Sequence, residues 1–326
     1  MPGLPFRGRH RRAPPSGSVV RRCVAAALQV APESNALNAR AIARNVERAT
    51  EWVVRCVEQT GAELLVLPEA VSTGFTPGVT PSRLWRLLSN VPGAVTDPIA
   101  EACERFRVHV VAGTYERGPS EGIVYNTAAL FGPGGMLGAY RKTHLFAGER
   151  IDGGGWVTSG DRASVLETEL GRVGTMICYD GDFPELARVS AVLGAEVLVR
   201  PSAFLRPADI FELTTRARAY DNHVFVVAAN AVGRDPAGVI YFGNSLVVGP
   251  TAAVLARGTS QEGWVTATLD GEQFTSVAPG SSHPQLFDHL ADRNLRMYAG
   301  YGESLFAAAV APFPHPLLDP DRRGGD

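Results

Sequence analysis

Apolar residues occur along this chain in short continuous runs that alternate with longer stretches of helical spacing. The run at 23–30 is followed by apolar positions at helical spacing over 35–59, and then by a second run at 63–67 that Pro68 ends. A short apolar run bounded by turn residues is typical of a buried strand, whereas the longer periodicity predicts an amphipathic helix. The alternation predicts an α/β protein with mixed sheets. By the same criteria we expect helices over 184–193 and 208–221, and strands over 108–112, 124–131, 137–140, 172–178, 196–199, 223–229, 239–248 and 252–256.

Turn residues and the lack of interior linkers indicate one main domain. Glycine and proline at 132–135 and at 249–250 each separate two strand-like runs, so each pair is predicted to form a hairpin. No repeat interrupts residues 23–273, which we assign to one domain. Residues 1–22 are rich in arginine and proline and are expected to be a disordered, solvated extension. Residues 274–326 form a C-terminal extension that suits either subunit contacts or packing on its own domain.

The composition excludes several classes of protein. The 326 residues are 45% hydrophobic, enough for a large core, and the net charge of -2 argues against a dedicated polyanion binder. No apolar run reaches the roughly 18 residues that span a bilayer, and the N-terminus lacks the apolar segment of a signal peptide. Four scattered cysteines without zinc spacing indicate a reducing compartment. We expect a cytoplasmic protein that binds neither nucleic acid nor membrane.

Cys178 is the first candidate for chemistry. It ends a strand-like run and is followed by acidic residues and by Pro184, which opens a predicted helix. A strand-to-helix turn aims a side chain away from the sheet, surrounds it with unpaired backbone N–H groups and favours a thiolate. Most buried cysteines only fill space, and we assign that structural role to Cys23, Cys56 and Cys103, which lack such a turn.

Two further strand ends carry residues suited to catalysis. Glu69 follows the buried run that Pro68 ends, and Lys142 and His144 follow the run at 137–140. Chemistry in α/β sheets gathers where strands end, so Glu69 is a candidate base and Lys142 or His144 a second catalytic group. The alternative for Glu69 is a solvated loop carboxylate, since most glutamates are exposed.

These three motifs, in this order, resemble those of the nitrilase superfamily, the carbon–nitrogen hydrolases. The resemblance implies a four-layer α-β-β-α sandwich with Glu69, Lys142 and Cys178 as the catalytic set. It also implies that the protein needs no cofactor and assembles into homodimers or larger homo-oligomers. The similar segments lie within about residues 23–270 and include 140–145, 178–185, 216–222, 226–230 and 242–245.

The chemistry of amide cleavage agrees with these residue types. Splitting an unactivated amide needs a nucleophile, a proton carrier and donors for the oxyanion. Cys178 is suited to attack the carbonyl, Glu69 to carry the proton and later activate water, and Lys142 to stabilise the oxyanion. The backbone N–H of Tyr179 is a second candidate oxyanion donor. A nearby Lys142 favours the thiolate and keeps Glu69 ionised, and the thioester route requires no metal.

Other residues are candidates for the walls of the site. The resemblance implies a second glutamate in the loop after the lysine, and Glu149 is the best match, although a glycine-rich loop at 152–155 departs from the family pattern. Arg200 ends a strand-like run and suits either a substrate carboxylate or a structural ion pair. His144 is expected to be structural, and His223 to open a strand in the core. The remaining candidates for substrate contacts are Phe75, Asn126, Trp156 and Phe204.

The residues after the cysteine favour an amide over a nitrile. Nitrilases proper usually have Trp and Glu there, whereas Tyr179 and Asp180 resemble the amidase and carbamoylase branches. We therefore expect hydrolysis of a small non-peptide amide or carbamoyl compound. Hydrolysis of N-carbamoyl amino acids or amines, nitrile hydrolysis and acyl transfer through the same thioester remain open. A binding or scaffold protein is a further class, which the joint presence of all three catalytic residue types argues against.

Overall fold

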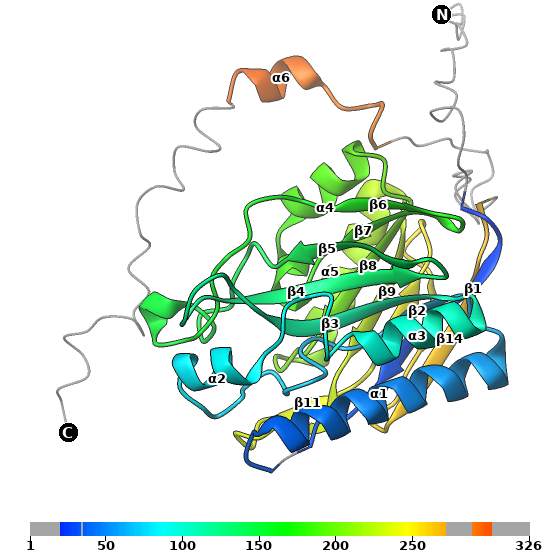
Figure 1. Ribbon diagram of the computed structural model, residues 1–326. Coiled ribbons are helices and arrows are strands. Elements are labelled where there is room, and N and C mark those ends of the chain that lie inside the picture. Colours follow the sequence, from blue (N-terminus) through cyan, green and yellow to red (C-terminus); the bar gives the residue numbers. More distant parts are fainter. Residues whose placement is uncertain (1–19, 34, 272–288, 302–326) are drawn as a thin grey trace, which may run out of the picture.

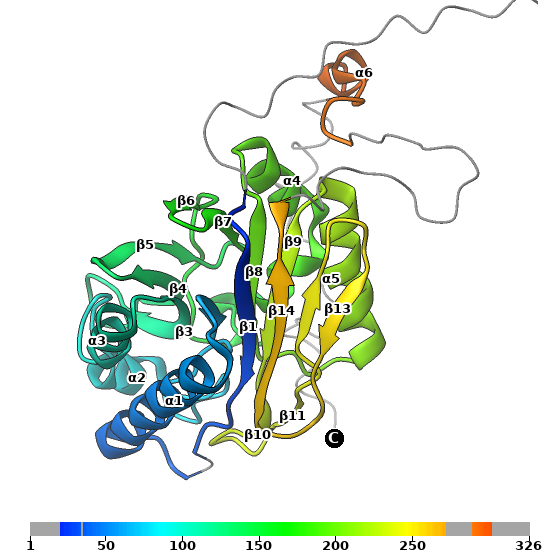
Figure 2. The ribbon, with the colours of Figure 1, turned by 90° about the vertical axis from the view of Figure 1, so that its right-hand side faces the viewer.

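The computed structural model describes residues 20–33, 35–271 and 289–301 and contains two facing six-stranded sheets (Figure 1). In the first sheet the strand order is β14-β1-β2-β3-β4-β5, and in the second it is β13-β12-β9-β8-β7-β6. Helices α1 and α3 cover the first sheet, whereas α4 and α5 cover the second, and Figure 2 shows the two helical layers on opposite sides. The result is a four-layer α-β-β-α sandwich.

The first half of the sandwich contains most of the N-terminal elements. Parallel pairing joins β1 to β2 and β2 to β3, and the remaining pairs of this sheet are antiparallel. Its strands are β1 (Cys23–Gln29), β2 (Leu64–Val66), β3 (His109–Arg117), β4 (Val124–Gly132), β5 (Gly135–Arg141) and β14 (Gly263–Leu269), and its helices are α1 (Ala39–Thr60), α2 (Pro81–Leu87) and α3 (Asp97–Phe106).

The second half is built around the parallel strands β7, β8 and β9. Its strands are β6 (Val165–Thr168), β7 (Gly171–Thr175), β8 (Val197–Ser202), β9 (Phe225–Asn230), β12 (Leu246–Val248) and β13 (Val254–Arg257), and its helices are α4 (Pro184–Val192) and α5 (Ala208–Asn222). A small ribbon of β10 (Val232–Arg234) and β11 (Ile240–Phe242), two short 3₁₀ helices η1 (Ile151–Gly153) and η2 (Cys178–Asp182), and α6 (Leu295–Ala299) complete the described elements.

The alternation of side chains along β1 explains why its sequence is apolar throughout. Ala25 and Ala27 lie in the core between the two sheets, whereas Ala26 and Leu28 lie in the core between the first sheet and its helices. A strand covered on both faces reads as a continuous apolar run instead of an alternating one.

Most predicted strands and helices are confirmed, and three positions are corrected. The segment 239–248 is not one strand, because Gly243 and Asn244 have positive φ angles of 66° and 56° and separate β11 from β12 in different sheets. Strand β7 ends before Cys178, which begins η2. His223 does not open a strand but caps α5 with φ 51°. The α-helices and strands without predicted bounds are α2, α3, α6, β6, β10 and β14.

The proposed extensions lie mostly outside the described residues. Of residues 1–22 only 20–22 are described, and of residues 274–326 only 289–301 are described. Among the described helices, none combines the length and apolar character that crossing a bilayer requires. In the same part of the chain, no group of three or more His, Cys, Asp or Glu side chains is arranged to hold a metal ion.

Candidate active site

The ends of three strands bring Glu69, Lys142 and Cys178 to the same edge of the sandwich. Glu69 follows β2, Lys142 follows β5, and Cys178 lies just beyond β7. Glu69 and Ala203 join the two sheets at this edge, because the Ala203 N–H donates to Glu69 Oε2 at 2.8 Å. Gly113 allows the chain at Glu69 to approach β3, since a Cβ at Gly113 would lie 2.8 Å from the Glu69 Cα. The packing of the strands therefore determines where the three side chains lie.

Lys142 is bound between two carboxylates inside this edge. Its Nζ donates to Glu69 Oε1 at 2.8 Å and to Glu149 Oε2 at 2.6 Å. The side chains of Lys142, Glu69 and Glu149 are fully buried. The glycine-rich loop after Lys142 therefore does not displace Glu149, which the structure brings into the same group. Charge-assisted hydrogen bonds of this length are strong and fix the lysine in one place.

Asn126 on β4 bridges the same two carboxylates. Its Nδ2 donates to Glu69 Oε1 at 2.7 Å and to Glu149 Oε1 at 2.8 Å, and the residue is fully buried. Both protons of the Asn126 side-chain amide are therefore donated to the two carboxylates. Asn126, expected to contact the substrate, holds Glu69 and Glu149 in place. Its Oδ1 has no hydrogen-bond partner among the described residues.

The charges of this group follow from its burial and its pairing. Burial opposes a charge on Lys142, but the adjacent Glu149 and Glu69 outweigh this and raise the lysine pKa above its ordinary value. Burial also raises the pKa of Glu149, an effect that Lys142 opposes and Glu69 reinforces. Lys142 is therefore a permanent cation, and Glu149 is the carboxyl whose charge depends on that cation.

The turn that carries Cys178 has a strained backbone. Cys178 has φ 46°, in the left-handed region that residues with a Cβ seldom occupy. Its carbonyl oxygen accepts hydrogen bonds from Arg200 Nε at 3.0 Å and Nη2 at 2.8 Å. Gly181 makes room for this guanidinium, since a Cβ there would lie 2.2 Å from Arg200 Cζ. The buried Arg200 thus stabilises the backbone of the Cys178 turn through its carbonyl oxygen.

Arg200 has its polar partners inside the protein. Besides the Cys178 carbonyl, its Nη1 donates to the hydroxyl oxygens of Thr214 and Thr215, both at 2.9 Å. Burial lowers the pKa of Arg200 to about 10. A guanidinium that is completely buried and engaged in this way is a structural group. Of the two roles considered for Arg200, the structure favours the structural one over contact with a substrate carboxylate.

Asp180 ties the turn to the segment after β5. Its carboxylate accepts hydrogen bonds from the Ile177 N–H at 2.8 Å, the Tyr140 hydroxyl at 2.8 Å and the His144 N–H at 3.0 Å. The ring of His144 contacts the same carboxylate through Nδ1 at 2.9 Å and stacks on Phe183. His144 is therefore a structural residue, as expected. In the sequence, Asp180 only favoured the amidase and carbamoylase branches over the nitrilases. That its carboxylate links the Cys178 turn to the segment after β5 was not predicted.

The electrostatics of Cys178 correct one expectation. Burial raises the pKa of the Cys178 thiol well above its ordinary value, and the negative charge of Glu69 adds to this. Lys142 and Arg200 act in the opposite direction but do not prevail. The expectation that Lys142 favours the thiolate is met only in direction, because complete burial outweighs the nearby cations. The sulfur rests as a thiol and must lose its proton during attack.

We predict that Cys178 shows no thiolate absorbance near neutral pH. The measurement is an ultraviolet difference spectrum between the wild-type protein and Cys178→Ser, recorded from about pH 6 to about pH 9. The other three cysteines cancel in the difference, so the spectrum should stay flat until the pH passes the ordinary range of a thiol. A thiolate band already present at neutral pH would contradict the raised pKa.

A narrow cavity opens beside the cysteine. Cys178 and four aromatic side chains line it, together with Arg206 and two apolar residues of the loop after β8. The aromatic residues are Phe75, Phe146, Tyr179 and Phe204. Phe75 and Phe204 therefore lie where the sequence placed them, whereas Phe146 and Arg206 were missed.

Trp156 lies behind this wall. Its ring packs edge-on against Phe75 at 6.3 Å and against Tyr115 at 6.2 Å between centroids. It supports Phe75 and is not among the residues that line the cavity. The peptide N–H of Tyr179 belongs to the first turn of η2, where backbone donors lack partners within the helix.

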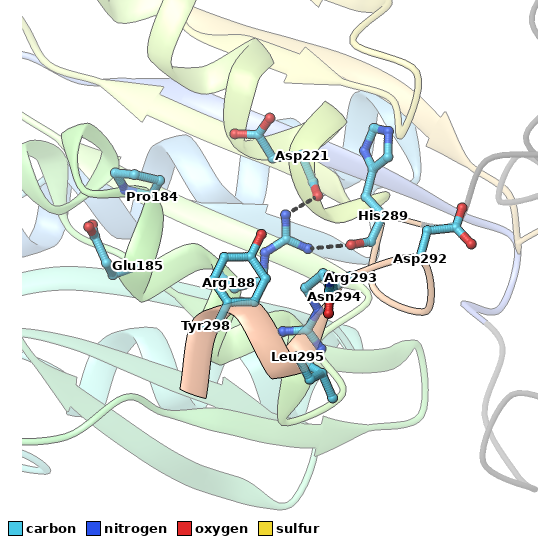
Figure 3. Close-up of a pocket in the computed structure, with 10 residues that line it drawn as sticks. All are labelled: Pro184, Glu185, Arg188, Asp221, His289, Asp292, Arg293, Asn294, Leu295 and Tyr298. Carbon is cyan, nitrogen blue, oxygen red and sulfur yellow. Dashed lines mark hydrogen bonds between the residues drawn. The ribbon is translucent and has the colours of Figure 1, made fainter. Parts of the chain in front are cut away.

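A larger cavity lies elsewhere, between α4, α5 and the segment 289–298 (Figure 3). Arg188 extends between its walls and donates hydrogen bonds to the carbonyl oxygens of Asp221 at 2.6 Å and His289 at 3.3 Å. Among the described residues that line it, none is a cysteine or a lysine. This cavity lacks the groups that amide cleavage requires, and the smaller one beside Cys178 is the candidate active site.

Comparison with known proteins identifies the family. Residues 24–279 match the model of the family described as "Carbon-nitrogen hydrolase". The chain is 34% identical over 247 residues to omega-amidase NIT2 of Homo sapiens, covering 72% of this chain and 85% of that protein. It is 32% identical over 256 residues to an (R)-stereoselective amidase of Pseudomonas sp, covering 78% and 87%. The chain belongs to the carbon–nitrogen hydrolase family of the nitrilase superfamily, as the motifs indicated.

Solved structures share the same architecture. Nit3 of Saccharomyces cerevisiae, a member of branch 10 of the nitrilase superfamily, matches with a TM-score of 0.68 at 26% identity, covering 79% of this chain and 94% of that one. A carbon–nitrogen hydrolase of Helicobacter pylori G27 matches with a TM-score of 0.72 at 23% identity, covering 87% and 99%. The expected four-layer sandwich is confirmed.

Proposed function

We propose that the protein hydrolyses the carbon–nitrogen bond of a small non-peptide amide through a thioester on Cys178. The observation that carries this proposal is the buried lysine bound to two carboxylates at the edge of the sheets where the cysteine turn and its aromatic cavity lie. A nucleophile, a proton carrier and an oxyanion donor are thereby collected in one dry site. Relatives named omega-amidase and (R)-stereoselective amidase support the choice of an amide.

In the first half of the reaction, the sulfur of Cys178 forms a bond to the amide carbon while its proton passes to Glu69. The carbonyl oxygen gains the negative charge, which Lys142 Nζ and the Tyr179 N–H stabilise. This coupling suits a resting thiol, because the raised pKa prevents ionisation before the substrate arrives. When the carbon–nitrogen bond breaks, Glu69 returns the proton to the departing nitrogen. Ammonia or an amine leaves, and a thioester remains.

In the second half, water attacks the thioester carbon as Glu69 accepts one of its protons. The carbon–sulfur bond then breaks, Cys178 regains a proton from Glu69, and the carboxylic acid is released. Lys142 stabilises the oxyanion again. Glu149 and Asn126 act indirectly, because they bind Lys142 and Glu69 from the side and fix their positions. All atoms and protons balance without a cofactor.

Three other reactions use the same residues. A nitrile would form a thioimidate on Cys178, an N-carbamoyl compound would form a carbamoyl thioester, and an amine in place of water would complete an acyl transfer. The amidase names of the relatives favour amide hydrolysis over these alternatives. Comparing amide, nitrile and N-carbamoyl versions of one acyl group, with and without an added amine, separates the four reactions.

The test of the proposed function is the detection of the thioester. We predict that intact-protein mass spectrometry after mixing with a hydrolysed amide shows an acyl adduct on Cys178, and that Glu69→Gln accumulates it. Glutamine is isosteric but can neither accept the thiol proton nor activate water, so both steps slow, and the adduct accumulates because hydrolysis of the thioester slows more than its formation. Glu116→Gln is a matched control, because Glu116 is a buried carboxylate paired with Arg141 and outside this group. An adduct on another residue, or hydrolysis without any adduct in either protein, would refute the proposal.

We further propose a cytoplasmic homodimer or larger homo-oligomer. All four cysteines are free, which agrees with a reducing compartment. Apolar side chains on the outer faces of α4 and α5 are exposed, which suits contacts between copies. They are Val189 (47%), Val192 (55%) and Leu213 (62%). Gel filtration with light scattering tests the oligomeric state.

A further inference from the structure

Arg200 is bound to the peptide group that joins Cys178 to Tyr179. Its guanidinium donates through Nε at 3.0 Å and through Nη2 at 2.8 Å, and both hydrogen bonds end on one atom, the carbonyl oxygen of Cys178. That oxygen and the Tyr179 N–H belong to the same peptide group. The arginine is therefore linked, through the atoms of one peptide, to a donor that the proposed reaction uses for the oxyanion.

The geometry of this peptide group fixes where its N–H points. The peptide is trans, so the N–H is directed opposite to the C=O and hence away from the guanidinium. Cys178 and Tyr179 both line the cavity of the candidate site, whereas Arg200 is fully buried on β8 and is not among the described residues that line it. Arg200 can thus act on a bound substrate only through the peptide that it holds or through the field of its charge.

The guanidinium is fixed in place and keeps its charge. Its Nη1 donates to the hydroxyl oxygens of Thr214 and Thr215, both at 2.9 Å. Burial lowers the pKa of Arg200 to about 10, which leaves it protonated at neutral pH. Asp182 Oδ1 lies 3.5 Å from its Nη2, but the same carboxylate also pairs with Arg206. The positive charge beside the Cys178 carbonyl is therefore only partly neutralised.

We propose that Arg200 is a positioning residue of the oxyanion site, which polarises the peptide after Cys178 and orients the Tyr179 N–H for the oxygen of the substrate. This inference rests on the proposed function, which assigns that N–H as an oxyanion donor. A cation at the carbonyl oxygen draws electron density from the peptide nitrogen, so the N–H becomes a stronger donor. Little solvent screens this effect in a buried site. The two hydrogen bonds also stabilise Cys178 at φ 46°.

Arg218 provides a matched control on the same turn. It is a buried arginine of α5, and its Nε donates to the carbonyl oxygen of Gly181 at 3.0 Å. That carbonyl shares its peptide group with the N–H of Asp182, which is not among the described residues that line the cavity. Replacing Arg218 should therefore disturb η2 without weakening the Tyr179 N–H.

The test measures the hydrogen bonding of the thioester carbonyl. In Glu69→Gln protein, an amide labelled with carbon-13 at its carbonyl carbon should form an acyl adduct whose C=O stretch is isolated by infrared difference spectroscopy against the unlabelled amide. Hydrogen bonds to the carbonyl oxygen lower this frequency. In that background we expect Arg200→Met to raise the frequency and Arg218→Met to leave it unchanged. Arg200→Lys keeps the charge but cannot form both hydrogen bonds, so it should give an intermediate frequency.

Steady-state kinetics provide a second measurement in protein that retains Glu69. Arg200→Met should lower kcat for ammonia release by about 10- to 100-fold with a smaller change in KM, because a weakened oxyanion donor acts mainly in the transition state. Arg218→Met should lower kcat far less, although it too loses a buried arginine. Urea unfolding establishes that each variant is folded in the assay. If Arg200→Met does not fold, Arg200→Lys is used for both measurements.

The outcomes separate this inference from the proposed function. An unchanged carbonyl frequency in both Arg200 variants would overturn the inference, while the adduct itself would support the proposed function. Equal frequencies and equal losses of kcat in Arg200→Met and Arg218→Met would also overturn it, because the arginine would then only stabilise the turn. If Glu69→Gln alone forms no adduct and the wild-type protein releases ammonia from no amide, the proposed function itself fails.

Discussion

Replacing Cys178 by alanine is expected to reduce ammonia release from any accepted amide by a factor on the order of 10⁴ or more. The cavity that Cys178 lines contains no second sulfur among its described lining residues. Water alone would have to attack the amide, and the remaining oxyanion donors cannot replace a covalent intermediate. The measurement is single-turnover ammonia release at a protein concentration above that of the substrate, which detects slow residual hydrolysis.

Cys103→Ala is the matched control for this experiment. Cys103 is a buried thiol on α3, in the core between the first sheet and its helices. Burial raises its pKa to about 12. It shares the residue type and the burial of Cys178 but not the turn, so its replacement should cost some stability and leave ammonia release intact. Comparable losses in both variants would show that the effect on activity arises from the fold and not from the nucleophile.

The central strands of the fold were predictable because they are buried on both faces. β1, β8 and β9 read as continuous apolar runs, which identify a strand without any partner. β14 was missed because most of its residues are half-buried, which weakens the apolar pattern. The segment 239–248 was taken as one strand because its apolar pattern does not reveal the left-handed bend at Gly243 and Asn244. The backbone conformation of these two residues, and not the apolar pattern, determines where the strands end.

The site was predictable as far as it depends on where strands end. Glu69, Lys142 and Cys178 each follow a strand, and the packing of the two sheets brings them together. The resting state of the thiol was not predictable in this way, because it depends on burial that only the packed sandwich creates. The role of Asn126 depends equally on strand pairing, since β4 and β5 must be neighbours for it to lie beside Lys142. Arg206 lies in a loop whose sequence has no distinctive pattern.

Replacing Lys142 by methionine is expected to reduce both activity and stability. Loss of one oxyanion donor should lower kcat by a factor on the order of 10²–10³. The same change leaves Glu69 and Glu149 buried without their cation, although Asn126 still donates to both. Removing one partner from a buried ion pair costs about 3–5 kcal/mol of unfolding free energy. Urea unfolding monitored by fluorescence measures this loss.

The pH dependence of that loss follows from Glu149. Its pKa is already raised by burial, and removal of Lys142 removes the charge that lowers it, so in the variant it should rise further. A carboxyl whose pKa is higher in the folded than in the unfolded state contributes stability below its unfolded pKa, and this is lost as the pH rises through the folded pKa. The deficit of Lys142→Met relative to wild type should therefore be larger at about pH 8 than at about pH 5.

A second substitution separates the electrostatic cost from the loss of packing. Lys142→Met combined with Glu149→Gln removes one of the two stranded charges while keeping the shape of the side chain and its place beside Asn126. We expect the double variant to recover part of the unfolding free energy and to lose the pH dependence that Glu149 causes, with no recovery of ammonia release, because Lys142 is still absent. A double variant that is no more stable than Lys142→Met at high pH would mean that the lysine acts through packing. The ion pairs of Lys142 with the two carboxylates would then contribute little to the free energy of unfolding, and the packing of the lysine side chain would account for the loss.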